Sequence, residues 1–302
     1  MALVLFVRAL PAAHAVRAHG DGEPPRPATA VHGEPERELH RALGLLQYVD
    51  GDYETAVSDD GVILDPDEFV EQHRILDEVA SILRAAAQVE FPTHRSGVDL
   101  VDAELERVRD AAAERRPSAA VRAAIRRLRT AIVATYALHL GPDRPPRRQR
   151  GQALYRQSCS ICHGSDGRGR TALALTLTQP PPDFRAARWR ETLSPYQVFN
   201  VVTFGIPGTA MPAFSGLDAD ERWDLAFHVT ALRHEPAPAD RTGAKTAAVA
   251  AEPRPSLSEL AGLTDAELGD WFVARGVSTA DRDAAVARAR RLQLHPDGRD
   301  SP

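Results

Sequence analysis

The sequence is poor in sulfur-containing residues. Among 302 residues there are only two cysteines, Cys159 and Cys162, and two methionines, Met1 and Met211. Two cysteines in one short segment exclude a framework of several disulfide bonds. They also exclude a zinc site built from two separate cysteine pairs. Any chemistry that depends on sulfur is therefore confined to this segment and to the single internal methionine.

The sequence also lacks long apolar runs and an excess of positive charge. Beyond the N-terminus no stretch reaches the roughly 18–20 apolar residues of a membrane span, so we expect no direct membrane span. The formal net charge is -5, which gives no indication of a nucleic-acid partner. The content of 43% hydrophobic and 26% charged residues is typical of a globular protein, and the length suffices for two modest domains.

The N-terminal segment, residues 1–34, has features of a signal peptide. Residues 3–10 are apolar apart from Arg8, and Ala13 and Ala15 form the small-x-small pattern that precedes a cleavage site. The usual positive n-region is missing, so a start further upstream or a plain apolar N-terminus are alternatives. Residues 16–34 are rich in Gly, Pro and charge and are predicted to be disordered.

Residues 35–140 show the periodicity of amphipathic helices. Apolar residues recur at three- and four-residue spacing in four segments, which predicts four helices joined by short connections, an arrangement typical of an antiparallel bundle. Asp65, Pro66 and Glu68 predict the start of the second helix as an N-cap, a first-turn proline and a capping-box residue. The apolar stripes are Leu39, Leu43, Leu46 and Val49; Phe69, His73, Leu76, Ala80 and Leu83; Val101, Leu105, Val108 and Ala112; and Val121, Ile125, Leu128, Ile132 and Tyr136.

The rest of the chain is also predicted to be helical, which makes the fold class all-α. Thr264 with Glu267 and Ser278 with Asp281 have the spacing of helix starts. The predicted divisions are 141–149, a Pro/Arg linker; 150–234, a small second domain; 235–255, an Ala/Pro linker; and 256–302, a helical tail.

Cys159, Cys162 and His163 form a C-x-x-C-H motif, the attachment signature of c-type haem. In such a motif two thiols bond the two vinyl groups of the haem, and the adjacent histidine is carried to the iron as an axial ligand. A thioredoxin-like redox pair is an alternative, but it requires a βαβ context that the sequence lacks. Half of a zinc site is another, but there is no second cysteine pair. The motif therefore predicts one covalently bound haem c.

Met211 is the candidate for the second axial ligand. It lies in a Gly/Pro-rich loop after the haem motif, not on a helical apolar stripe. A thioether is a soft ligand for haem iron, and His/Met ligation raises the reduction potential. The alternative is a core methionine that fills a packing gap. Gly205 and Gly208 in the same loop are expected to let the backbone approach the macrocycle.

Residues 148–234 resemble bacterial class I cytochromes c. The resemblance is carried by the motif, by Met211, by Gly151 and Tyr155 in the entry helix, and by a capped C-terminal helix that begins near Asp218. It implies that the entry and C-terminal helices cross. It also implies that a carbonyl in the proline-rich segment 180–184, which we assign to Pro180, accepts a hydrogen bond from the ring of His163.

A second resemblance covers the chain more widely. Residues 45–57 and the tail segment 258–265 resemble the soluble periplasmic part of bacterial fused cytochrome c/iron permeases. The membrane permease itself is absent from this sequence. The iron-binding R-E-x-x-E motif of that family is also absent, because the matching segment that begins at Arg37 ends in Arg41. The resemblance implies a membrane iron permease as a candidate partner and a link to iron uptake.

These features together predict a single-electron carrier, not an enzyme. With His163 and Met211 both bound, the iron has no open position for a substrate, and the expected partner is a redox protein. The alternatives are a haem enzyme or sensor with a labile Met211, or a docking subunit of an iron permease. Covalent haem attachment in bacteria of this kind takes place outside the cytoplasmic membrane, so we expect a periplasmic protein.

Overall fold

The computed structural model describes residues 33–89, 95–206, 208–234 and 253–292. The predicted signal peptide and most of the predicted 235–255 linker lie outside the described residues. Within the described ranges the chain is helical and has no strand, only an isolated bridge between Val57 and Ile63. The all-α prediction is confirmed.

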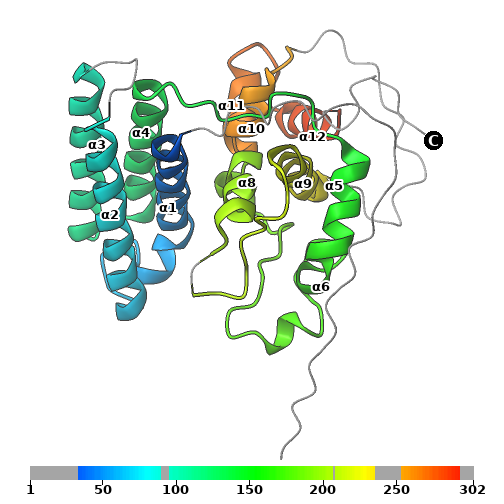
Figure 1. Ribbon diagram of the computed structural model, residues 1–302, viewed down its shortest axis with the longest axis horizontal. Helices are drawn as coiled ribbons and strands as arrows, with labels where there is room; N and C mark the ends of the chain where they lie inside the picture. Colours follow the sequence, from blue (N-terminus) through cyan, green and yellow to red (C-terminus); the bar gives the residue numbers. More distant parts are fainter. Residues whose placement is uncertain (1–32, 90–94, 207, 235–252, 293–302) are drawn as a thin grey trace, which may run out of the picture. The chain divides into compact units, whose positions relative to one another are not determined.

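The four N-terminal helices lie side by side (Figure 1). They are α1 (Glu34–Ala56), α2 (Pro66–Ala86), α3 (Arg95–Ala113) and α4 (Ser118–Thr135). Helix α1 packs on α2 and α4, and α3 packs on α4 and touches α2. The residues of the predicted stripes from Leu39 to Val49 and from Val121 to Ile132 are 0–1% exposed, so the apolar periodicity identified the buried faces of α1 and α4; in α2, Phe69 and His73 of the predicted stripe are only half-buried.

Helix α2 begins where its sequence predicts. The Asp65 carboxylate caps the helix by accepting hydrogen bonds from the backbone N–H groups of Asp67 at 3.0 Å and Glu68 at 3.1 Å. The Glu68 side chain accepts a hydrogen bond from Gln72. Pro66 occupies the first helical position, where a backbone N–H has no acceptor within the helix. The missing N–H of proline is therefore no disadvantage at this position.

The segment after the bundle contains α5 (Arg148–Leu154), a π-helical turn (Tyr155–Cys159), α6 (Ser160–His163), α7 (Trp189–Thr192), α8 (Pro195–Phe204) and α9 (Ala219–Ala231). Helix α9 packs on both α5 and α8. Asp218 caps α9 with Glu221 at the third position, as predicted, and Trp223 and Phe227 lie on its buried face. The entry and C-terminal helices therefore contact each other as the class I cytochrome c pattern implies.

The tail helices α10 (Leu257–Gly262), α11 (Asp265–Val273) and α12 (Arg282–Leu292) pack against this segment through α8, α7 and α9 respectively. Arg290 is 1% exposed and donates to Asp265 Oδ1 at 2.9 Å. Asp265 also accepts from Arg233 and His234, which follow α9. Burial alone raises the pKa of Asp265, but Arg290, His234 and Arg233 outweigh it and hold this pKa below its usual value. A buried ionic network therefore joins the tail to the end of α9.

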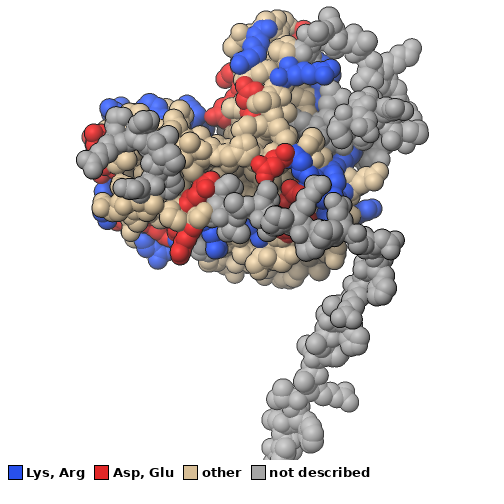
Figure 2. Space-filling model, turned by 45° about the horizontal axis from the view of Figure 1, so that its top comes forward, with Lys and Arg blue, Asp and Glu red and all other residues tan. Residues whose placement is uncertain are grey.

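Charged side chains of both signs are interspersed on the described surface that Figure 2 shows, without an extended basic area. No helix among the described residues is long and apolar enough to span a membrane. The same part of the chain contains no group of three or more His, Cys, Asp or Glu side chains placed to hold a metal ion.

Candidate functional site

The C-x-x-C-H motif lies at the end of one helical segment with a π-helical turn in its middle. Helix α5 continues through the turn Tyr155–Cys159 into α6, which ends at Gly164 with a φ of 75°. A π turn inserts one extra residue into a helix and is common at functional sites. Here it places Cys159 on the buried side, while Cys162 remains partly accessible.

Gly151 and Tyr155 fix this segment on α9. A Cβ atom at position 151 would collide with the backbone carbonyl of Asp224, so only glycine permits the observed approach of the two helices. One turn later the Tyr155 ring meets His228 edge-on at 5.2 Å, and its hydroxyl donates to the Gly164 carbonyl at 2.7 Å. The tyrosine thereby connects the helix contact to the end of the motif.

The environment of Cys159 argues against a redox-active dithiol. Burial and, to a smaller extent, the neighbouring Cys162 together raise the pKa of Cys159 to about 12. A thioredoxin-like pair needs a thiol with a lowered pKa, because the thiolate is the nucleophile. The thiol of Cys159 is instead neutral and lies against the apolar core.

His163 is partly buried and stacks on Phe184, with ring centroids 4.8 Å apart and planes 16° apart. Burial lowers the pKa of His163 to about 4, so its imidazole is neutral at physiological pH, as a metal ligand must be. Its Nδ1 is buried and has no hydrogen-bond partner. The predicted hydrogen bond to the Pro180 carbonyl is therefore not formed in this structure.

Pro180 lies at an exposed position. The carbonyl of Pro181 lies against Gly169, whose N–H donates to the His163 carbonyl at 2.8 Å. The proline segment thus meets the loop that follows the motif, while the His163 ring is oriented by its stacking on Phe184. The assignment of Pro180 as a partner of His163 has no support in this geometry.

Met211 is held in a loop that closes back on itself. Its carbonyl accepts from the Ile206 N–H at 3.0 Å, and its own N–H donates to Thr209 Oγ1 at 3.1 Å. Its side chain is partly buried and packs against the same apolar cluster as Cys159. Gly205 has a φ of 71° and lies against the backbone of Met211 and Ala213. Gly205 thus permits a close approach within the loop itself, and its approach to a macrocycle stays a prediction.

The residues of this region suit a covalently attached haem. Large apolar side chains stay accessible beside the motif, with Ile161 65%, Leu173 41% and Leu175 81% exposed. The turn that carries the two leucines is anchored to the motif, because Thr171 Oγ1 donates to the Cys162 carbonyl at 3.2 Å. Two thiols, an imidazole nitrogen of His163 without a hydrogen-bond partner and accessible apolar side chains form a donor set and a surface that match a porphyrin and its iron.

Comparison with known proteins supports the same class. Residues 146–229 match the family model described as cytochrome C oxidase, cbb3-type, subunit III, which covers just over a quarter of the 302 residues. This segment is therefore a domain of the c-type cytochrome class, and such a domain implies haem c. No curated protein and no solved structure matches the chain.

Sequence reasoning missed the ionic anchor of the entry helix. Asp224 on α9 is fully buried and accepts from the backbone N–H of Arg147 at 2.6 Å and from its Nε at 3.1 Å. Arg144 donates to the same carboxylate at 3.3 Å. The only signal in the sequence is the run of arginines in the 141–149 linker, and nothing in the sequence indicates which acid they meet.

Proposed function

We propose that this protein is a cytochrome that transfers single electrons through one haem attached to Cys159 and Cys162, with His163 and Met211 as the axial ligands. The observation that carries the proposal is the placement of both thiols and the neutral imidazole at the end of one helical segment locked onto α9. The match of residues 146–229 to a cytochrome c family model supports the same class.

Each residue has a defined task in this proposal. A bound haem supplies a one-electron couple between ferric and ferrous iron. Cys159 and Cys162 fix the group covalently, His163 presents a neutral nitrogen, and the loop hydrogen bonds of Met211 present a thioether. If His163 and Met211 both held the iron of a bound haem, a substrate would have no open site there, and the accessible apolar residues would shield the group from water. The arrangement suits an electron carrier rather than an enzyme.

The partners and the cellular location belong to the same proposal. A redox protein accepts or donates the electron, and the resemblance of residues 45–57 to fused cytochrome c/iron permeases supports a membrane iron permease as a second partner. We place the protein in the periplasm, because covalent attachment of haem c occurs outside the cytoplasmic membrane. A pull-down with an iron permease from the same genome tests the link to iron uptake.

The visible absorption spectrum tests the ligation. The wild type and Met211→Ala are produced together with haem c maturation proteins, and spectra are recorded in both oxidation states with and without carbon monoxide. Ala210→Ser is the matched control, since Ala210 is an exposed neighbour in the same loop. We expect a low-spin covalent haem in the wild type and the control, and a high-spin haem that binds carbon monoxide in Met211→Ala.

Two results contradict the proposal in different ways. A wild-type protein without covalent haem refutes haem attachment at Cys159 and Cys162. A wild-type haem that is already high-spin and binds carbon monoxide refutes ligation by Met211 and supports a haem enzyme or sensor.

A further inference from the structure

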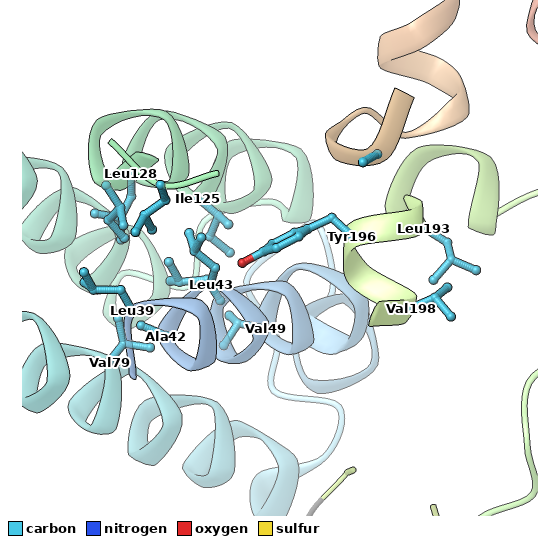
Figure 3. Packing of buried hydrophobic residues seen from close by; sticks show 14 of the residues in the cluster. Leu39, Ala42, Leu43, Val49, Val79, Ile125, Leu128, Leu193, Tyr196 and Val198 are labelled. Carbon is cyan, nitrogen blue, oxygen red and sulfur yellow. The ribbon is translucent and has the colours of Figure 1, made fainter. Parts of the chain in front are cut away.

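Helix α8 has a face that contacts the N-terminal bundle. Tyr196, Asn200 and Phe204 are spaced four residues apart, so they lie in one row along the helix. All three meet α1. Figure 3 shows Tyr196 extending from α8 toward α1, with its hydroxyl near Leu43, while Val198 points away.

The contacts along this row are specific. The Tyr196 hydroxyl and His40 Nδ1 form a hydrogen bond of 2.5 Å, and Tyr196 is 1% exposed. Asn200 Nδ2 donates to the His40 carbonyl at 3.4 Å. At the end of the row the guanidinium of Arg37 lies 5.9 Å from the centre of the Phe204 ring. The segment that begins like an iron-binding motif in the sequence thus serves as a contact surface for α8.

The other side of α8 carries the Met211 loop. The carbonyl of Val202 accepts from the Phe214 N–H at 2.9 Å. The helix ends at Gly205, whose backbone lies against Met211 and Ala213, and Ile206 donates to the Met211 carbonyl at 3.0 Å. The loop is therefore attached to the C-terminal end of α8 at both of its ends.

We propose that Tyr196 is a positioning residue for Met211: by fixing α8 on α1 of the bundle, it holds the Met211 loop in place and keeps the thioether available to the iron. The inference rests on the proposed function, since Met211 is a ligand only when haem is bound. It assigns the N-terminal bundle a role in axial ligation. A ligand held by packed and hydrogen-bonded neighbours loses less freedom on binding, so it dissociates less readily.

Gly44 offers a way to separate α1 from α8. A Cβ atom at this position would lie 3.6 Å from Asn200 Cβ, which is an ordinary van der Waals contact. Gly44→Ala therefore fits, while the larger side chain of Gly44→Leu must push α8 away. Gly51 on the same helix has nothing within 4 Å of its Cβ position, so Gly51→Leu is the matched control. Tyr196→Phe removes only the hydroxyl and keeps the packing.

The experiment uses the full-length protein with haem attached. Three quantities are measured: the methionine-to-iron charge-transfer band of the ferric form, the rate of carbon monoxide binding to the ferrous form, and the hydrogen exchange of the Ile206 and Phe214 amides. In Tyr196→Phe we expect carbon monoxide to bind about fivefold faster, the scale of one lost hydrogen bond. In Gly44→Leu we expect a larger effect, loss of the band and faster exchange at both amides. Gly44→Ala and Gly51→Leu should match the wild type.

The outcomes separate this inference from the proposed function. The positioning role is refuted if the charge-transfer band, the rate of carbon monoxide binding and the amide exchange are all unchanged in Tyr196→Phe and in folded Gly44→Leu. The electron-carrier proposal stands in that case. If Gly44→Leu does not fold, Tyr196→Phe alone decides. If the wild type carries no covalent haem, the proposed function fails, and exchange at Ile206 and Phe214 still decides whether α1 stabilises the loop.

Discussion

Replacing Asp224 with alanine should destabilise the protein by removing the ionic anchor between the entry helix and α9. The carboxylate is fully buried and receives the Arg147 N–H at 2.6 Å, the Arg147 Nε at 3.1 Å and Arg144 at 3.3 Å. In Asp224→Ala the backbone N–H of Arg147 has no acceptor. Loss of a hydrogen bond to a charged acceptor costs about 1.5–3 kcal/mol.

The guanidinium groups lose less. The side chain of Arg144 is 30% exposed and that of Arg147 is 52% exposed, so water replaces the carboxylate as their partner. Surface ion pairs of this kind contribute about 0.2–1 kcal/mol each. The loss of one hydrogen bond from a backbone donor and of two ion pairs predicts a total of about 2–5 kcal/mol. For a chain of this size that lowers the Tm by about 3–8 °C.

Thermal and urea unfolding followed by circular dichroism measure this cost. Asp220→Ala is the matched control, because Asp220 is 46% exposed and binds the same Arg144 at 2.5 Å. It should cost less than about 1 kcal/mol. Asp224→Asn retains an acceptor for the Arg147 N–H and should fall between the two. If Asp224→Ala is no less stable than Asp220→Ala, the anchor does not stabilise the fold and the reasoning is refuted.

Two further predictions concern the same helix contact. Gly151→Ala places a methyl group against the Asp224 carbonyl and should cost about 1–3 kcal/mol in urea unfolding, as overpacked cores do. Gly216→Ala, with open space at its Cβ position, should be neutral, and equal stability of the two variants contradicts the argument. Burial, with smaller effects from Arg148 and Arg156, lowers the pKa of His228 from 6.5 to about 4. Because the folded pKa lies below the unfolded one, the contribution of His228 is complete above pH 6.5 and is lost as the pH falls toward 4. Between pH 7 and pH 4 the wild type loses this contribution, whereas His228→Phe has none to lose. The fall in the free energy of unfolding should therefore be about 2–3 kcal/mol smaller in His228→Phe than in the wild type, measured by urea unfolding at each pH. Parallel pH profiles for the two proteins contradict this prediction.

Local signals in the sequence predicted several elements correctly. The start of α2 at Pro66 follows from the Asp65 cap, and the start of α11 follows from the reciprocal pair Thr264 and Glu267. The interactions that define such starts lie within one helical turn, so the sequence contains all of their partners. Ser278 and Asp281 do form hydrogen bonds with each other, but α12 begins only at Arg282, after this turn.

The motif Cys159–Cys162–His163 and the loop position of Met211 were also readable, since residue type and spacing carry the chemistry of haem attachment. Their ligand roles remain a prediction for spectroscopy. The hydrogen bond assigned to Pro180 was wrong for this structure, because Nδ1 of His163 has no partner and the ring stacks on Phe184. Stacking depends on how two distant segments fold together, which spacing along the chain does not determine.

The sequence alone thus determined the helix class, the core stripes of the bundle and the candidate haem motif, because each depends on residues that are close along the chain. Only the tertiary structure decided which surfaces meet. His40 contacts Tyr196 across 156 positions and Arg147 contacts Asp224 across 77. Many arginines and acids could pair equally well in an extended chain. The physical reason is that such pairings are selected by the packing of whole helices, which local periodicity does not encode.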